Sequence, residues 1–451
     1  MITYLEYERA KEQGQLESFI LSSIGVYKSS EDYKWAKYGV DYSTGKNTEI
    51  TNYRKIIYNV LGQAMEDNIS PNHKITANFF GMFVRQRAAY VLGNGISFEN
   101  DTTKNKLGRE FDHLTFFAGQ DSLTQGVVYG FWNLDHIEYF PAKEICPIFD
   151  DETGKLRVAI RFWQVSDDAP MRITLFEEDG ITEYRTHRVK GEYEKTEIIL
   201  ITLREKTAYK HTVNITEADG EELTSGTNYS TLPIIPWYPN RQKQSYLVGL
   251  KDKIDAYDLL TSGLVNDVDG ELIYWTLKNQ GGMNDDISLQ SFLDKLKAVH
   301  AVVVDESDEA TPHSVDPPTN ARMITKESLR ADLYRDAMAL DVEILKAGNV
   351  TATQINAAYE PLNEAADEFE FCTIRFINEL LELLGVDDYP KFTRSQERNK
   401  AEETDMVLSA AALIPRDVAI DKLPFLTPEE KEEAKRIAAE EDIARMTEEV
   451  E

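Results

Sequence analysis

The chain has 451 residues and a formal net charge of −30, from 49 Lys and Arg against 79 Asp and Glu. This length is sufficient for more than one domain. Cys146 and Cys372 lie far apart without Cys or His neighbours, which excludes a zinc signature and a disulfide framework and indicates a reducing compartment. The acidity argues against a protein that grips a nucleic-acid backbone, but not against one past which DNA slides.

The sequence lacks the signals of membrane insertion and export. No stretch approaches the roughly 18 apolar residues of a membrane span. The first ten residues have neither a basic region nor an apolar core, as a signal peptide would. We therefore expect a soluble, intracellular protein.

The first 245 residues mix helix and strand patterns. We predict helices over residues 53–65 and 75–92; the second has Phe79, Phe83, Arg87 and Tyr90 at helical spacing and ends at Gly93-Asn94-Gly95. Runs rich in β-branched and aromatic residues, separated by turn signals, then predict antiparallel strands. These runs are Gly126–Trp132, His136–Phe140, Leu156–Trp163, Arg172–Glu177, Thr182–Val189, Glu197–Leu203 and Tyr209–Asn214. Leu232–Trp237 closes the region, since its two prolines exclude a central strand.

The pattern changes at Ser245, a predicted helix N-cap. Apolar or semi-apolar residues then recur every three or four positions, which predicts an amphipathic helix with a heptad-like seam. They are Leu247, Leu250, Ile254, Tyr257, Thr261, Leu264 and Val268. A small insertion with a helix over 289–296 and a strand over 301–304 follows, and it ends at Asp316-Pro317-Pro318.

Two more long helices are predicted after the insertion. The first covers 325–344, with Thr325 as its N-cap. The second runs from Thr351 or Thr353 to Leu384, and Pro361 should kink or divide it. Because a long helical hairpin cannot bury both of its faces alone, we expect neighbours in an oligomer.

No pattern in the sequence predicts an active site. The phosphate-binding patterns GxxxxGK[ST] and GxGxxG are absent, as are HExxH and GxSxG. Asp267-Val268-Asp269-Gly270 starts like a calcium loop, but the twelfth position is Lys278 instead of Glu. We therefore predict no enzyme, no catalytic residue, no cofactor and no metal.

Four stretches of the sequence carry a resemblance to a known family. They are Tyr42–Ile50 with Asn72–Phe98, Gly126–Trp163 with its Pro141–Asp150 element, Leu250–Gly282 with Ile254-Asp255-Ala256-Tyr257-Asp258, Ser262 and Asn266-Asp267, and Phe392–Arg416. Together they cover most of the chain, which resembles the SPP1-type portal proteins of tailed bacteriophages. Asn349–Thr353 matches the family's tunnel-loop pattern only loosely, and Pro415 replaces a serine of the C-terminal pattern.

The resemblance implies an α+β, multi-domain portal subunit. Its parts are an α+β wing (1–244), a first stem helix (245–269), a small α/β clip (270–318), a second stem helix (319–344), a tunnel loop (345–353), a tunnel helix (354–390) and a helical crown (391–451). About twelve copies would form a ring at one capsid vertex, the channel for DNA packaging and ejection. The subunits would assemble in the host bacterial cytoplasm and end in the virion.

The resemblance also implies partners and site residues. The partners are double-stranded DNA, the terminase large subunit, a head-tail adaptor, and the major capsid and scaffold proteins, without a membrane. The implied residues are Lys346, Gly348, Asn349 and Thr351 in the DNA-tunnel loop, Glu360, Glu364, Asp367 and Glu368 in an acidic tunnel lining, and Leu250, Ile254, Tyr257 and Leu264 in oligomer packing of the stem.

Alternatives stay open for the sites and for the function. Twelve chains would together carry about −360, and an acidic wall repels phosphates within roughly 8–10 Å, so DNA would slide. Lys346 would touch a phosphate or be a solvated lysine favoured by the helix dipole. The stem residues would pack between copies or within one chain. The alternative function is a head-tail adaptor or a minor capsid protein, whereas a packaging ATPase lacks its nucleotide loop.

Overall fold

The computed structural model describes residues 2–58, 62–67, 70–166, 168–190, 196–215, 222–269, 273–278, 309–314, 318–345, 351–395, 404, 407–411, 414–423, 426 and 428–448. The chain divides into two compact units. One comprises Met1–Ala339 and Glu364–Arg394, and the other Leu340–Asn363 and Ser395–Glu451. Helices and antiparallel sheets both contribute, which confirms the predicted mixture of helix and sheet. No helix in the described ranges has both the length and the apolar character needed to cross a membrane.

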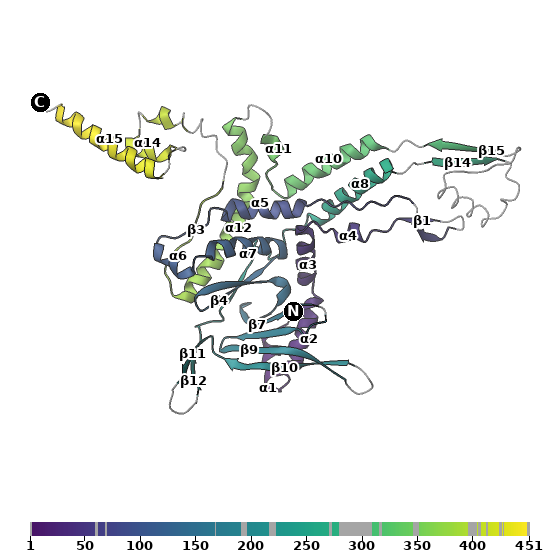
Figure 1. The fold of residues 1–451 in the computed structure, drawn as a ribbon, viewed down its shortest axis with the longest axis horizontal. Helices are drawn as coiled ribbons and strands as arrows, with labels where there is room; N and C mark the ends of the chain where they lie inside the picture. Colours follow the sequence, from purple (N-terminus) through teal and green to yellow (C-terminus); the bar gives the residue numbers. More distant parts are fainter. Residues whose placement is uncertain are drawn as a thin grey trace. The chain divides into compact units, whose positions relative to one another are not determined.

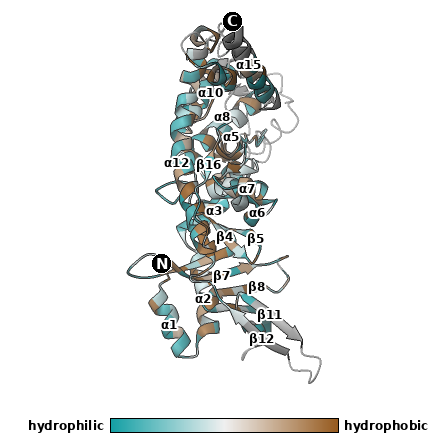
Figure 2. Cartoon of the chain, turned by 90° about the vertical axis from the view of Figure 1, so that its left-hand side faces the viewer, coloured by the Kyte–Doolittle hydropathy of each residue, from teal (hydrophilic) through white to brown (hydrophobic). Residues whose placement is uncertain are grey.

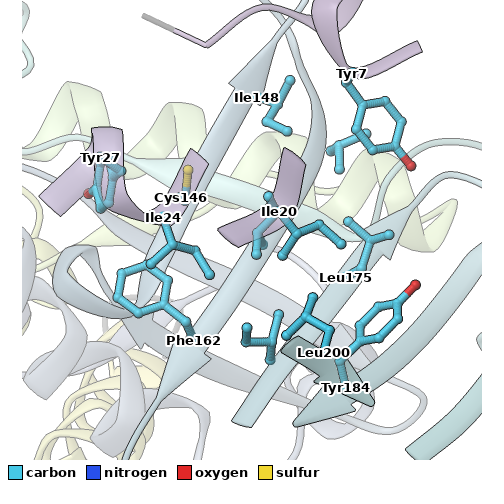
Figure 3. Packing of buried hydrophobic residues seen from close by; sticks show 13 residues of the cluster. Tyr7, Ile20, Ile24, Tyr27, Cys146, Ile148, Phe162, Leu175, Tyr184 and Leu200 are labelled. Carbon is cyan, nitrogen blue, oxygen red and sulfur yellow. The ribbon is translucent and has the colours of Figure 1, made fainter. Parts of the chain in front are cut away.

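A five-stranded antiparallel sheet forms one end of the first unit (Figure 1). Its strands follow in chain order: β6 (Ile145–Phe149), β7 (Leu156–Trp163), β8 (Arg172–Glu177), β9 (Gly180–Lys190) and β10 (Thr196–Thr207). Alternate strand residues, including Ile160 and Leu175, pack against Ile20 and Ile24 (Figure 3). The helices α1 (Tyr4–Glu12) and α2 (Leu16–Lys28) therefore cover one face of the sheet, as the period of two residues requires.

A three-stranded sheet packs on an aromatic cluster. Its order is β13 (Ile234–Trp237), β4 (Val128–Asn133) and β5 (His136–Pro141). The Trp237 ring stacks on the rings of Phe369 and Phe376, with centroids 6.0 and 5.0 Å away. Gly130 is required here, because a Cβ atom at this position would lie 2.7 Å from the Phe376 ring. Pro236 lies in β13, an edge strand, where a missing N–H is tolerated.

Five more of the described helices belong to the first unit. They are α3 (Glu31–Ser43), α4 (Thr48–Thr51), α5 (Phe79–Leu92), α6 (Asp101–Leu107) and α7 (Phe111–Gln125). The helix α5 begins at Phe79 instead of residue 75, because Asn78 is its N-cap, and it ends as predicted, since Gly93 is its C-cap and Gly95 takes a positive φ of 75°. Arg87 is buried on α5 together with Phe83 and Tyr90, the apolar spacing that predicted the helix.

Two long helices of the first unit form a hairpin. The helix α8 (Lys251–Asp269) packs on α10 (Thr319–Asp336), and the strand pair β14 (Ile273–Lys278) and β15 (Glu309–Ser314) extends the hairpin. The predicted helix over 289–296 and strand over 301–304 lie outside the described residues.

The remaining described elements are a short 3-10 helix, three strand pairs and four helices. They are η1 (Ala142–Glu144), the strand pairs β1 (Ile56–Tyr58) with β2 (Ala64–Glu66), β3 (Ile96–Ser97) with β16 (Lys391–Phe392) and β11 (Lys210–Ile215) with β12 (Glu222–Thr227), and the helices α11 (Val342–Leu345), α12 (Ala352–Leu384), α14 (Arg416–Lys422) and α15 (Pro428–Glu448).

The predicted strands are confirmed, but they divide among three sheets. The seven runs correspond to β4, β5, β7, β8, β9, β10 and β11. The predicted helix over 53–65 is wrong. This segment instead contains the strands β1 and most of β2, because Ile56 and Ile57 favour extended backbone and Gly62 reverses the chain at φ 74°.

Three predictions about helix ends need correction. Ser245 is not the N-cap of α8, which begins at Lys251, since Gly249 at φ 87° interrupts the helical path. Thr325 lies inside α10, where its hydroxyl donates to the Ala321 carbonyl at 2.9 Å. The same helix ends at Asp336 instead of residue 344, because Met338 turns the chain at φ 46°.

The helix α12 continues through Pro361, so of the two predicted effects, a kink or a division, the division is wrong. Proline removes one backbone hydrogen bond. Tyr359 and Leu362, on either side of Pro361, are buried, and this burial holds the helical path. Thr351 begins the helix as predicted, since its hydroxyl accepts from the Gln354 N–H at 3.3 Å.

Candidate functional site at the base of the helical hairpin

The helices α8 and α10 are joined at both ends by ion pairs. Lys253 pairs with Asp336 near the base of the hairpin, and Asp267 pairs with Arg322 near its far end. Such pairing of early with late residues makes the two helices antiparallel. The strands β14 and β15 continue in register from Ile273 opposite Ser314 to Lys278 opposite Glu309. The hairpin is therefore one continuous arm over its described length.

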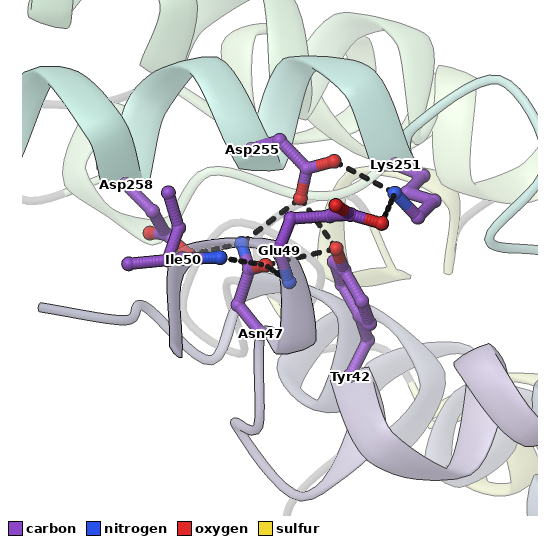
Figure 4. A network of polar contacts seen from close by, with 7 residues as sticks. All are labelled: Tyr42, Asn47, Glu49, Ile50, Lys251, Asp255 and Asp258. Carbon is purple, nitrogen blue, oxygen red and sulfur yellow. Dashed lines mark hydrogen bonds and ion pairs between the residues drawn. The ribbon is translucent and has the colours of Figure 1, made fainter. Parts of the chain in front are cut away.

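Asn47 joins the base of this arm to the helix α4 (Figure 4). Its Oδ1 accepts from the backbone N–H groups of Glu49 and Ile50 at 3.1 and 3.2 Å, which caps α4. Its Nδ2 donates to Asp255 Oδ1 and to Asp258 Oδ2, each at 2.9 Å. One buried amide thus satisfies a helix end and two carboxylates of α8.

Asp258 is the most buried carboxylate of this network, with no exposed surface. Its Oδ1 accepts from the Ala77 N–H at 2.9 Å. Burial raises the pKa of Asp258 to about 6, and the charge of Asp255 adds to the rise, whereas the hydrogen bonds from Asn47 and Ala77 oppose it. The carboxyl group therefore changes its protonation in mildly acidic solution.

Asp255 receives more partners than Asp258 does. The hydroxyl of Tyr42 donates to Asp255 Oδ1, and Lys251 Nζ donates to Asp255 Oδ2 at 2.8 Å. Burial alone would lower the pKa of Lys251, but the bonds with Asp255 and Glu49 outweigh it, so the pKa is raised. Burial and the bond to Asp255 raise the pKa of Tyr42. The lysine is therefore held charged beside the carboxylate.

The polar face of α8 continues beyond Asp258 and holds an extended segment. The Ser262 hydroxyl accepts from the Ile75 N–H at 2.9 Å, and Asn266 Oδ1 accepts from the His73 N–H at 2.6 Å. Together with the bond from Ala77 to Asp258, three backbone N–H groups of residues 73–77 are bound by one face of the helix. Asp258, Ser262 and Asn266, which belong to the motif in Leu250–Gly282, thus position this segment.

Arg87 connects the base of the hairpin to α5. Its Nη2 donates to the Tyr246 hydroxyl at 2.7 Å and to the Ala337 carbonyl at 3.1 Å. Its guanidinium also lies 3.8 Å from the centroid of the Tyr246 ring. Tyr246 precedes α8, and Ala337 is the C-cap of α10. Burial lowers the pKa of Arg87, and its contact with Tyr246 opposes the shift.

The four residues assigned to stem packing have two environments. Leu250 and Ile254 are buried within the single chain. Tyr257 and Leu264 are half-buried, and the Tyr257 ring meets Phe79 edge-on at 4.9 Å. Part of the seam therefore packs within the chain, which leaves Tyr257 and Leu264 partly accessible.

The acidic residues assigned to the tunnel are exposed on α12, whose side facing the viewer in Figure 2 is mostly hydrophilic. They are Glu360, Glu364, Asp367 and Glu368. Asp367 pairs with Arg394, and the Glu368 carboxylate accepts from the Arg241 N–H at 3.1 Å. Two of the four carboxylates therefore have partners within the first unit.

The tunnel-loop residues Lys346, Gly348 and Asn349 lie outside the described residues. Thr351 is described and exposed; its N–H donates to Gln354 Oε1 at 3.1 Å, so it forms the capping end of α12. In the parts of the chain that the structure describes, no cluster of three His, Cys, Asp or Glu side chains could hold a metal ion.

Sequence reasoning missed Asn47, Arg87 and Tyr246 as functional residues. Arg87 gave a signal, because a charged residue within an apolar helical stripe must find buried partners. Asn47 stands directly before Thr48 and Glu49 and fits the N-cap pattern. The sequence held no sign that either side chain meets the hairpin.

The fold and this site define a structural protein with a long anchored hairpin. Comparison with known proteins gives its family: residues 30–445 match the family described as "Phage portal protein, SPP1 Gp6-like". The chain belongs to this family of phage portal proteins, as its sequence motifs indicated. Membership makes it a structural component of phage particles, and the family is structural rather than catalytic.

Individual relatives agree with the family. The chain is 25% identical over 431 residues to the portal protein of Clostridium phage phiCD119, covering 85% of this chain and 88% of that one. It is 23% identical over 432 residues to the portal protein of Bacillus phage SPP1, covering 88% and 82%. A chain from the neck of a native GTA particle, computed with C12 symmetry, matches with a TM-score of 0.38 at 10% identity, covering 86% and 97%.

Proposed function

We propose that the chain is one subunit of a portal ring of about twelve copies at a capsid vertex. The ring is the channel for DNA packaging and ejection. In this proposal residues 1–244 form the wing, α8 and α10 lie in the stem, 270–318 form the clip, 345–353 the tunnel loop, 354–390 the tunnel helix and 391–451 the crown. Family membership supports the assignment.

The observation that carries the ring is the apolar surface left on the hairpin. Leu259 and Val268 on α8 are 44% and 84% exposed, and Met323 and Ile324 on α10 are 59% and 71% exposed. Exposed aliphatic side chains on both helices of a projecting arm indicate protein contacts. If each arm meets a different surface of its neighbour, the contacts repeat head to tail and close into a ring.

The acidic residues support the channel. Glu360, Glu364, Asp367 and Glu368 are exposed, and their charges would repel phosphates and let DNA slide. Lys346, Gly348, Asn349 and Thr351 would form the loop nearest the DNA. The terminase large subunit and then a head-tail adaptor would dock on the clip, and major capsid and scaffold proteins would surround the ring during assembly in the bacterial cytoplasm.

The substitution Ile324→Asp tests the ring. Because Ile324 is 71% exposed, a carboxylate there should leave the subunit folded and place an unpaired charge in the contact. We expect the wild type to form rings, seen by negative-stain electron microscopy, with a mass near twelve times 51.4 kDa by mass photometry. The variant should remain mostly monomeric.

Ile324→Met, which keeps an apolar side chain, is the control and should still form rings. Far-ultraviolet circular dichroism establishes that both variants are folded. Rings of unchanged mass in Ile324→Asp would remove the hairpin contact from the proposal. A wild type that stays monomeric at all concentrations would contradict a ring that assembles from this chain alone.

A further inference from the structure

One face of the five-stranded sheet carries a row of four side chains, one from each of the strands β7 to β10. Trp163 on β7 is opposite Arg172 on β8, Arg172 is opposite Arg185 on β9, and Arg185 is opposite Ile201 on β10. This row lies on the face opposite to Ile173 and its cross-strand partner Tyr184, which belong to the buried cluster under α1 and α2.

The two central arginines are exposed and face each other directly across the strands. Like charges at directly opposed positions destabilise a sheet. Within the described ranges, neither guanidinium forms an ion pair or a side-chain hydrogen bond. Among the described residues, the arrangement therefore carries an electrostatic repulsion that a negative partner would relieve.

Arg161 and Arg204 of this sheet, in contrast, are compensated within the chain. On the same face, Arg161 pairs with Glu144 at 3.4 Å, and its guanidinium lies 3.9 Å from the Phe140 ring. Arg204 pairs with Glu183 at 3.7 Å. Although the chain has a net charge of −30, none of its described carboxylates pairs with Arg172 or Arg185. The exposed pair thus differs from Arg161 and Arg204.

Apolar and titratable side chains surround the arginine pair. Trp163 is 38% exposed and Ile199 is 41% exposed, and Ile199 is opposite the exposed His187. We name Trp163, Arg172, Arg185, His187 and Ile199 the arginine face. Its combination of guanidinium groups with an exposed indole and an aliphatic side chain is typical of residues that anchor protein contacts.

We propose that the arginine face binds an acidic segment of a partner protein. Carboxylates of the segment would form bidentate bonds with Arg172 and Arg185, and its apolar side chains would lie on Trp163 and Ile199. A protein fits better than a nucleic acid, because two arginines give few phosphate contacts and the rest of this acidic chain repels a long polyanion. The proposal does not depend on ring formation.

A labelled peptide of repeated Glu-Glu-Leu units is the probe, and fluorescence anisotropy with the full chain measures its binding. We expect salt-dependent binding that Arg172→Glu and Arg185→Glu each weaken about tenfold or more, since each removes a charge-assisted bond and adds a repulsive charge. Arg188→Glu is the matched control. It makes the same charge change on β9 but on the other face, where Arg188 is opposite Ile198, and should change binding less than about twofold.

Urea unfolding of each variant verifies that it is folded. Arg172→Glu should be at least as stable as the wild type, because it places opposite charges at directly opposed positions. Absence of peptide binding to the wild type would overturn the proposal, as would an equal loss in Arg188→Glu. Tighter binding of a short DNA duplex than of the peptide, lost in the same two variants, would replace the protein partner with a nucleic acid.

Discussion

The helices α8 and α12 both carry many carboxylates, but they place them in different surroundings. On α8, Asp258 is fully buried and the Asp267 side chain is 13% exposed, and both are bound by groups from other segments. On α12, Glu360 and Glu364 face solvent. Asp258 and Asp267 hold structure together, whereas Glu360 and Glu364 form a surface. A count of acidic residues therefore says little about their use until their partners are known.

The largest expected effect on stability comes from removing the Asn47 amide, which binds the carboxylates of α8. Asn47→Ala deletes an N-cap and removes one hydrogen-bond donor from each of Asp255 and Asp258. We expect a loss of about 3 kcal/mol in the free energy of unfolding. Urea denaturation followed by circular dichroism measures it.

Asn52→Ala is the control for that experiment, because Asn52 is exposed at the other end of α4. It should cost less than about 0.5 kcal/mol. A cost in Asn47→Ala no larger than in Asn52→Ala would show that the network of Figure 4 does not hold the hairpin.

The pH dependence of stability tests the burial of a single carboxylate, that of Asp258. The pKa of Asp258 is raised to about 6 by burial, from an ordinary value near 4 in the unfolded chain. The folded chain then holds this proton more tightly than the unfolded chain does. The stabilisation that the bound proton gives the fold is complete below pH 4 and is lost as the pH rises through about 6. Relative to Asp258→Asn, the wild type should lose about 2 kcal/mol between pH 4 and pH 7.

Urea denaturation of both proteins at several pH values gives this difference. Asp252→Asn, an exposed substitution on the same helix, controls for the general effect of charge. A constant difference between the wild type and Asp258→Asn over that interval would contradict the assignment of the proton to Asp258. Asp255, Tyr42 and Lys251 surround the site and stay unchanged in all three proteins.

The smallest effect is expected on α12. Glu364→Gln removes an exposed charge and should change the free energy of unfolding by less than about 0.5 kcal/mol. Thermal unfolding monitored by circular dichroism measures it. A loss above 1 kcal/mol would mean that this carboxylate is engaged in the fold as Asp258 is, and the contrast between the two helices would fail.

Local patterns in the sequence were sufficient for seven strands and for the helices α5, α8, α10 and α12, whereas the helices α1, α2, α3, α6 and α7 were not predicted. The strands β7 to β10 follow from runs rich in β-branched and aromatic residues between turn signals, and one face of their sheet is buried. The limits of the hairpin helices did not follow. Gly249 before α8 and Met338 after α10 take positive φ values, which set the start of one helix and the end of the other. Only the packed structure selects that conformation for a methionine.

The site was predictable in part. The resemblance singled out Asp255, Asp258, Ser262 and Asn266 by their spacing, which places polar groups along one side of a helix. That they bind Asn47 and the backbone of residues 73–77 follows only from the fold, since the partners are about 200 residues away in sequence.

The sequence alone determined the family, the mixture of helix and sheet, and the amphipathic character of the hairpin, because motifs and periodicity are local properties. Only the tertiary structure decided which charges are buried. Whether a carboxylate or an arginine is paired depends on the segment that packs beside it, as the contrast between Asp258 and Glu364, or between Arg161 and Arg172, demonstrates. The path of the chain sets those neighbours, and no local pattern encodes it.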